Sequence, residues 1–416
     1  MLKEGHMKLS DDVVLFEYAG FSILGNLATG AVIGLDIDEL NACKNAIERN
    51  NRECCLGNLP SDLIDVMHQG RFFEDEKEAT FSRSAYFHVT QRCNLDCVGC
   101  YSADSKRNAS SDLSFPSVEM ILDKLASLGV GSLVISGGEP FLRDDLPDIV
   151  SAAKSKGIES VSIITNGTCV RKGILEKLSG LVDKIAVSFD GLSADSKSYL
   201  RGCQRFDILK KSVCAIKAEG MEAHLIATIH AFNIQDIPSY FELACSMGAS
   251  VNFSLLSCPA NDVHLERLIP DDDALNRLAD TLMGCVGQNV SFCGLDLNGS
   301  VSAKGRCGAG LTCLSVSHDG LLYPCHMLQV DGYAIADLLR DELDDIKRQI
   351  GNSVFSGLDV DSVYGCSDCE LKYLCGGGCR ARSLYAYGDI RFRDPYCALA
   401  KRFYRLLGES LKNSFA

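Results

Sequence analysis

Three cysteines lie close together in the segment CNLDCVGC, which runs from Cys93 to Cys100. Three residues separate Cys93 from Cys97, and two separate Cys97 from Cys100. A structural zinc site normally has four protein ligands, whereas three thiolates can hold three irons of a 4Fe–4S cluster and leave the fourth iron open to a substrate. The spacing therefore favours an iron–sulfur cluster. Zinc is the alternative, and His88, which precedes the cysteines on a predicted strand, is a further candidate ligand.

Cysteine is unusually frequent in the whole chain, with 21 among 416 residues. The net charge of −14 argues against a nucleic-acid partner, because phosphate contacts need Lys and Arg. No apolar run approaches the roughly 20 residues of a membrane-spanning helix, and the polar start MLKEGHMKLSDD lacks the apolar core of a signal peptide. We therefore expect a cytoplasmic protein with no membrane partner, and in that compartment clustered cysteines indicate metal ligands before disulfides.

The remaining cysteines fall into two sets. Eight crowd the C-terminal part: Cys307, Cys313, Cys325, Cys366, Cys369, Cys375, Cys379 and Cys397. Ten are scattered, and we expect them to be small buried apolar residues; they are Cys43, Cys54, Cys55, Cys169, Cys203, Cys214, Cys245, Cys258, Cys285 and Cys293.

Residues 1–80 are predicted to form a small α+β module. The runs VVLFEYAG, FSILGN and AVIGLD are rich in β-forming residues and are separated by turn residues, which predicts a three-stranded antiparallel sheet. DELNACKNAIERN and PSDLIDVMHQG predict two helices. The segment RFFEDEKEAT, residues 71–80, is interpreted as a charged linker.

Residues 81–295 alternate predicted strands and helices. The strands are AYFHVT, SLVISG, SVSIIT, KIAVSFD, AHLIATIH and ASVNFSLL. Six βα repeats imply a parallel sheet in an open, partial barrel, since a closed barrel needs eight. The chemistry of such folds lies at the carboxyl ends of the strands, and CNLDCVGC directly follows the first strand.

Residues 296–416 are rich in cysteine and glycine. LTCLSVSHDGLLYPC predicts a hairpin that turns at Asp319 and Gly320, and PYCALAKRFYRLLGESLKN predicts a terminal helix. The apolar core of this part is too thin to fold alone, so we expect bound metal to stabilise it.

The cysteine spacing after the first strand of a six-fold βα repeat resembles the radical S-adenosylmethionine (radical SAM) superfamily. As in that family, an aromatic residue, Tyr101, follows the third cysteine. The segment ISGGEP is similar to the family's glycine-rich motif, which implies that Gly137, Gly138 and Glu139 contact the methionine end of S-adenosylmethionine. The segments ITNG and VSFDG also lie at predicted strand ends, as in this superfamily.

The same resemblance implies that two further polar residues contact S-adenosylmethionine. Ser188 is expected to meet the ribose or the carboxylate of S-adenosylmethionine, and Arg201, in YLRG, is expected to pair with that carboxylate. A strand-end hydrogen bond for Ser188 and a surface ion pair for Arg201 are the alternatives. The implied reaction is reductive cleavage of S-adenosylmethionine, which yields a 5'-deoxyadenosyl radical that removes a hydrogen atom from the substrate.

The C-terminal cysteines resemble the pattern of the SPASM domain, which holds two auxiliary 4Fe–4S clusters. The resemblance assigns one cluster to Cys307, Cys313, Cys325 and Cys379, and the other to Cys366, Cys369, Cys375 and Cys397. Some members leave the iron at the position of Cys313 open for substrate, and two zinc ribbons are a second alternative. With the radical-generating cluster, the expected total is three 4Fe–4S clusters.

The N-terminal module resembles the RiPP recognition element, a PqqD-like winged fold that binds the leader of a precursor peptide by strand addition. A plain structural extension is the alternative. The expected fold is thus α/β: a partial (β/α)6 TIM-like barrel with an N-terminal winged-helix-like α+β module and a C-terminal iron–sulfur SPASM domain. The resemblance implies a maturase that crosslinks a ribosomal precursor peptide, through a thioether or a carbon–carbon bond, with flavodoxin or ferredoxin as electron donor.

Two other functions are weighed against this one. A sulfatase-type maturase oxidises Cys or Ser to formylglycine, but such enzymes carry an Asp directly after the cysteine that closes the hairpin, where this chain has His326. They also lack a leader-binding module. His326 remains the candidate catalytic residue of this chain. The second alternative is a non-enzymatic metal-binding scaffold whose N-terminal module recruits a partner.

Overall fold

The computed structural model describes residues 6–48, 52–55, 59–76, 83–103, 107–202, 205–257, 265–285, 292–293 and 300–415. Its centre is a curved parallel sheet. The strands in chain order are β6 (Arg83–Thr90), β7 (Val130–Gly137), β8 (Ser160–Thr165), β9 (Lys184–Ser188), β10 (Glu222–Ile229), β11 (Ser250–Leu255) and β12 (Phe292–Cys293). Neighbours in the sequence are neighbours in the sheet, and each pair is parallel. The expected α/β class with a partial barrel is therefore confirmed.

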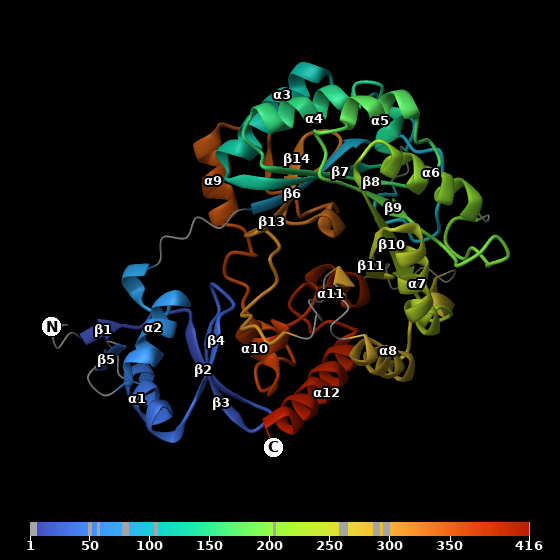
Figure 1. Cartoon of the computed structure of the whole chain (residues 1–416). Helices are drawn as coiled ribbons and strands as arrows, with labels where there is room; N and C mark the ends of the chain where they lie inside the picture. Colours follow the sequence, from blue (N-terminus) through green and yellow to red (C-terminus); the bar gives the residue numbers. More distant parts are fainter. Residues whose placement is uncertain are drawn as a thin grey trace.

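Helices alternate with these strands. They are α3 (Phe115–Ser127), α4 (Leu146–Ser155), α5 (Lys172–Leu178), α6 (Phe206–Ala218), α7 (Ile237–Met247) and α8 (Asp272–Gly284). In α3, buried Val118, Ile121, Leu122 and Leu125 recur at the spacing of one helix face, so that face packs on the sheet while the opposite face meets solvent. In Figure 1, α3 to α6 follow the outer side of the curved sheet, and the C-terminal helix α11 (Arg380–Tyr387) lies on its inner side.

The C-terminal part begins by extending the same sheet. β13 (Cys313–Val316) pairs in parallel with β6, and Cys313 lies opposite Ser84. β13 also forms the predicted hairpin with β14 (Leu321–Tyr323), which pairs with β15 (Ala336–Asp337). Gly320 in the turn has a φ of 91°, a conformation that favours glycine. The sequence predicts the hairpin but not its attachment to β6, because pairing between distant segments leaves no local signal.

Among the described residues of the C-terminal part, four helices follow the hairpin: α9 (Leu343–Gly351), α10 (Lys372–Cys375), α11 (Arg380–Tyr387) and α12 (Cys397–Phe415). The predicted terminal helix is α12, which packs along α8 (Figure 1). Short 3-10 helices lie in the connections: η2 (Glu74–Glu76), η3 (Pro140–Leu142), η4 (Ile234–Asp236), η5 (Glu266–Leu268), η6 (His326–Leu328) and η7 (Val360–Ser362).

The N-terminal module has a three-stranded antiparallel sheet, as the sequence predicts. Its strands are β2 (Val13–Tyr18), β3 (Phe21–Asn26) and β4 (Val32–Leu35), and its helices are α1 (Ile37–Glu48) and α2 (Ser61–Gln69). Asp36 begins α1 in a reciprocal cap: its carboxylate accepts the N–H of Glu39, and the Glu39 carboxylate accepts the N–H of Asp36. A short pair, β1 (His6–Lys8) with β5 (Glu53–Cys55), adds an unpredicted second ribbon.

The segment interpreted as a charged linker is partly core. Phe72 and Phe73 are fully buried in the module's own apolar cluster, and Phe73 forms an isolated bridge with Leu9. Burial of the two aromatic rings stabilises the module, and this stabilisation outweighs the preference of the following acidic residues for solvent. The linker interpretation is therefore wrong at its first residues.

The module is fixed to the C-terminal part by direct contacts. The hydroxyl of Tyr18 donates to the carbonyl of Tyr404 in α12 at 2.6 Å. The carbonyl of Gly30 accepts the N–H of Ala303 at 3.0 Å. In Figure 1 the module's strands lie beside α10 and α12.

The scattered cysteines do not all fit the expectation of buried apolar residues. Cys43 and Cys285 are buried and Cys169 is half-buried, but Cys214 and Cys245 are exposed on helices α6 and α7. The side chains of Cys54, Cys55, Cys203, Cys258 and Cys293 lie outside the described residues. Across the described part of the chain, no helix is long and apolar enough to cross a membrane.

Candidate active site

A cavity of about 270 Å³ opens at the carboxyl ends of the barrel strands. Its lining joins the two halves of the structure, because residues of the cysteine loop face residues that follow the C-terminal hairpin. Among the predicted site residues, the lining includes Cys93, Cys97, Cys100, Tyr101, Gly137, Gly138, Ser188, Arg201 and His326. The sequence motifs that the resemblance groups together thus meet at one place.

The cysteine loop is held from several sides. The N–H of Cys93 donates to the side chain of Asn108 at 2.9 Å, and the N–H of Val98 donates to the carbonyl of Leu200 at 2.7 Å. Burial raises the pKa of the Cys97 thiol to about 11, although the nearby Arg201 cation opposes this shift. A buried thiol of this kind becomes a thiolate most readily when metal replaces its proton.

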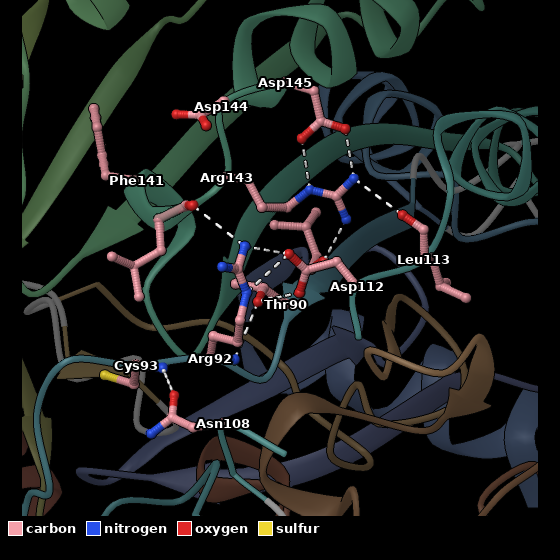
Figure 2. Close-up of polar contacts among 12 residues, drawn as sticks. Thr90, Arg92, Cys93, Asn108, Asp112, Leu113, Phe141, Arg143, Asp144 and Asp145 are labelled. Atoms are coloured by element: carbon pink, nitrogen blue, oxygen red, sulfur yellow. Dashed lines mark hydrogen bonds and ion pairs between the residues drawn. The ribbon is translucent and has the colours of Figure 1, made fainter. Parts of the chain in front are cut away.

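The loop's first residues are fixed by two arginine–carboxylate pairs (Figure 2). Arg92 pairs with Asp112 at 2.5 Å, and the hydroxyl of Thr90 donates to the same carboxylate at 2.5 Å. Arg143 pairs with Asp145 at 2.6 Å and also donates to the carbonyl of Val89 at 2.8 Å. The chain therefore leaves β6 in a defined direction toward Cys93.

The glycine-rich motif packs directly on this loop. The N–H of Gly138 donates to the carbonyl of Thr90, and the N–H of Glu139 donates to the carbonyl of Arg92, both at 2.8 Å. A Cβ on Gly138 would lie 2.1 Å from the carbonyl oxygen of Arg92, and one on Gly137 would lie 2.3 Å from that of Thr90. A side chain at either position would clash with the loop, so only glycine fits there.

Glu139 is fully buried behind the cavity wall. Its carboxylate accepts the hydroxyl of Thr165 and the N–H of Asn166, each at 2.7 Å, and the N–H of Phe141 at 3.0 Å. Burial raises the pKa of Glu139, and these hydrogen bonds only partly offset the rise. In this structure the side chain joins the ends of β7 and β8 and thereby shapes the cavity.

Arg201 lies at the cavity beside the end of β9. Its Nε is 3.3 Å from the carboxylate of Asp190, and its Nη1 donates to the carbonyl of Ser188. The ion pair is largely buried, unlike the surface pair that the sequence left as an alternative. These two contacts occupy one edge of the planar guanidinium and fix its orientation.

Aromatic rings close the opposite end of the cavity. His326 stacks on Tyr86 with ring centroids 4.1 Å apart, and Tyr101 meets His326 edge-on at 5.3 Å. Burial lowers the pKa of His326 to about 4, and burial is also the largest cause that lowers the pKa of His88 to about 3. Among the described residues, His326 Nδ1 and His88 Nε2 have no hydrogen-bond partner. The two rings are therefore neutral near pH 7.

The predicted first group of C-terminal cysteines lies behind this aromatic end. Burial raises the pKa of Cys325 well above its usual value, and the neighbouring charges of Cys313, Cys379 and Cys307 raise it further. Cys307, Cys325 and Cys379 also belong to one apolar cluster. Cys325 directly precedes His326, so this group adjoins the main cavity.

The predicted second group lines a separate cavity. Cys366, Cys369, Cys375 and Cys397 all contribute to its wall, together with Arg393 and Lys401. Among the described residues, no group of three or more His, Cys, Asp or Glu side chains is placed to hold a single metal ion. A four-iron cluster takes one sulfur on each iron, so four thiols around one cavity are the arrangement that suits it.

Sequence reasoning missed several residues of the site. Arg107, Asn166 and Arg382 all contact or line the cavity. Asn166 lies in the ITNG segment, which the sequence does single out. Arg107 and Arg382 have no motif, and only the folded chain brings them to the cysteines.

Comparison with known proteins agrees with this geometry. Residues 87–244 match the Radical SAM superfamily. The PqqA peptide cyclase of Gluconobacter oxydans is 28% identical over 328 residues, which cover 75% of this chain and 89% of that protein. The Fe-coproporphyrin III synthase of Methanosarcina barkeri is 26% identical over 381 residues, with coverage of 82% and 92%. The crystal structure of Streptococcus suis SuiB bound to precursor peptide SuiA has a TM-score of 0.62 at 18% identity and covers 94% of this chain and 99% of that chain.

The partial barrel and the cysteine loop after β6 agree with the match to this family over residues 87–244. The chain contains a radical SAM domain, the kind of domain that works with a 4Fe–4S cluster and S-adenosylmethionine. The observed residues suit both groups: three cysteines share one cavity wall, and Gly137 and Gly138 line the same cavity.

Proposed function

We propose that the chain is a maturase that crosslinks a ribosomally synthesised precursor peptide. The observation that carries the proposal is the single cavity that joins the cysteine loop to His326, Met327 and Arg382 of the C-terminal part. A peptide segment there would lie between the radical-generating site and the first C-terminal cysteine group. The relatives include a peptide cyclase, and the likeness to SuiB extends over the N-terminal module.

In this proposal Cys93, Cys97 and Cys100 hold the cluster, and Gly137, Gly138, Ser188 and Arg201 receive S-adenosylmethionine. When bound, these groups supply the 5'-deoxyadenosyl radical. The protein's own contribution is position: Arg201 presents its guanidinium beside Cys97, and Glu139 holds the strand ends that form the wall. Tyr101 and His326 close the cavity, which keeps water from the reacting atoms, and His326 is the candidate for direct contact with substrate.

The two C-terminal groups are proposed to hold auxiliary clusters, one on Cys307, Cys313, Cys325 and Cys379 and the other on Cys366, Cys369, Cys375 and Cys397. Their support is the electrostatic proximity of the first four and the shared cavity of the second four. The total is three clusters, with a flavodoxin or ferredoxin as electron donor. A cytoplasmic location remains a prediction from the sequence.

The leader of the precursor is proposed to bind along β2, an edge strand of the N-terminal sheet. A groove of about 480 Å³ runs between β2 and α1, with Val14, Phe16 and Lys44 among its walls. Its far wall is Tyr373 of the C-terminal part, whose ring lies 5.8 Å from that of Phe16. An extended leader could add to β2 through main-chain hydrogen bonds.

The groove can be tested by leader affinity. Deletion of residues 1–78, or Tyr373→Ala in the full chain, is expected to weaken leader binding in a fluorescence anisotropy assay. Tyr364→Ala is the control, because Tyr364 is an exposed tyrosine of the C-terminal part that lies outside the groove. Unchanged affinity in the deletion variant would show that the leader binds elsewhere.

The proposed bond is a thioether, with carbon–carbon closure as the alternative. The support is the combination of a leader-binding module with eight C-terminal cysteines, which the thioether-forming class shares. Either bond removes two hydrogen atoms from the peptide, so mass alone does not separate them. Iodoacetamide does, because a thioether sulfur no longer reacts while a carbon–carbon crosslink leaves every thiol free. A product that has lost two hydrogens and still alkylates fully would contradict the thioether.

A tetrapyrrole substrate is the second candidate, since one relative is an Fe-coproporphyrin III synthase. Mass spectrometry decides between the two when the chain is co-expressed with short Cys-containing peptides encoded next to it, and the same cells are analysed for newly formed Fe-coproporphyrin III. Formation of that porphyrin without any change in the peptides would overturn the proposal. Formation of formylglycine would instead support the sulfatase-type alternative, which the residue His326 disfavours.

A further inference from the structure

Arg107 lies against the loop that carries the three cysteines. Its Nη2 donates to Cys100 Sγ at 3.3 Å and to the carbonyl and hydroxyl oxygens of Ser102, each at 3.0 Å. Its Nη1 reaches the carbonyl of Leu95 at 3.5 Å. One cation therefore contacts both sides of the loop and one of the sulfurs directly.

The charge of Arg107 acts on all three cysteines. Arg107 interacts electrostatically with Cys100, Cys93 and Cys97, and its guanidinium stays ionised because arginine does not lose its proton in proteins. Asn166 provides a second polar hydrogen at this site, since its amide is 3.8 Å from Cys93 Sγ. The amide is neutral, so Arg107 supplies the positive charge in direct contact with a sulfur.

We propose that Arg107 raises the reduction potential of the 4Fe–4S cluster that Cys93, Cys97 and Cys100 would hold, through its N–H···S bond to Cys100 and its charge. Reduction adds one electron from the external donor and makes the cluster more negative. A nearby cation and a hydrogen bond to sulfur stabilise the reduced form more than the oxidised form. Arg107 is thus a positioning and potential-setting residue, and this role rests on the proposed cluster site.

The test is a redox titration of the reconstituted full-length protein, without peptide or S-adenosylmethionine. Reduced-cluster EPR signals are followed against potential, and the signals of the Cys93/Cys97/Cys100→Ala variant are subtracted to remove the auxiliary clusters. Arg107→Met removes charge and donors, Arg107→Gln keeps donors, and Arg107→Lys keeps the charge. In Arg107→Met the equilibrium constant for reduction of the cluster should fall at least about tenfold, which lowers the potential by about 59 mV for one electron.

The variants separate the possible roles of the residue. The reduction potential of Arg107→Lys should stay close to that of the wild type, and that of Arg107→Gln should lie between the values of the Lys and Met variants. Arg171→Met is the control, because Arg171 contacts Asp144 and the carbonyl of Phe141 instead of the loop. An unchanged potential in Arg107→Met with full iron content would overturn the inference. So would a failure of all three variants to retain iron, since Arg107 would then be a structural clamp. Full iron in the triple-cysteine variant would instead refute the cluster site itself.

Discussion

Arg382 and Asp394 form a buried ion pair, with Nη2 and Oδ2 2.5 Å apart and both side chains less than 5% exposed. The same carboxylate accepts the N–H of Cys379 at 2.7 Å, and the main-chain carbonyl of Asp394 accepts the N–H of Cys397 at 3.1 Å. Burial opposes ionisation of Asp394, but the Arg382 cation and the backbone N–H groups prevail and hold its pKa below the usual range. One aspartate thus ties together both C-terminal cysteine groups.

Asp394→Asn should destabilise the C-terminal part strongly, because it leaves Arg382 buried without its counter-ion, a loss of about 3–5 kcal/mol. The thermal midpoint and the iron retained after desalting report it. Asp280→Asn breaks the half-exposed pair with Arg402 and should cost no more than about 1 kcal/mol. Equal effects of the two variants would contradict the structural role of the buried pair.

The same pair predicts a pH dependence. Because the folded-state pKa of Asp394 is lowered, its stabilising contribution is fully present above the ordinary aspartate pKa of about 3.9 and is lost as the pH falls below it. The acid limb of a stability–pH curve should therefore be steeper in the wild type than in Asp394→Asn. Parallel acid limbs would show that this carboxylate does not carry the effect.

Gly138→Ala should disrupt the cysteine loop. The new Cβ would lie 2.1 Å from the carbonyl oxygen of Arg92, so the strand end or the loop must move. We expect loss of S-adenosylmethionine binding, measured by equilibrium dialysis, and lower iron content. Gly173→Ala is the control, because nothing lies within 4 Å of a Cβ at that helical position; it should bind like the wild type.

Replacement of Cys93, Cys97 and Cys100 by Ala should remove about a third of an expected total of about twelve irons. All cleavage of S-adenosylmethionine should stop, as measured by 5'-deoxyadenosine release. Cys397→Ala should instead leave cofactor cleavage in place while peptide modification fails. Production of 5'-deoxyadenosine by the triple variant would refute the assignment of the radical site.

His326→Phe should separate peptide chemistry from cofactor cleavage. Phenylalanine keeps a ring to stack on Tyr86 but lacks the Nδ1 atom that has no partner among the described residues. We expect a lower rate of peptide modification with little change in 5'-deoxyadenosine release and in the thermal midpoint. A wild-type rate of modification would show that His326 has no role in the peptide chemistry.

The sequence predicts the parts of the site that depend on local pattern. Strand ends follow from periodicity, so the positions of Cys93, Gly137 and Ser188 at one edge of the sheet could be anticipated. The partners of Arg107 and Arg382 could not, because their contacts arise where loops fold back on one another. Phe72 shows a related error: charge in the neighbouring residues suggested a linker, whereas burial of the aromatic ring decides the structure.

The parallel pairing of β13 with β6 also bears on how the polypeptide can be divided. Without residues 296–416, β6 would be an open edge strand with unpaired main-chain groups, which invites pairing with another molecule. A barrel expressed alone should therefore aggregate, and adding the missing half as a separate chain should restore solubility only if the two meet during folding. Insertions and gene fusions are accordingly better tolerated at the chain ends than between the two halves.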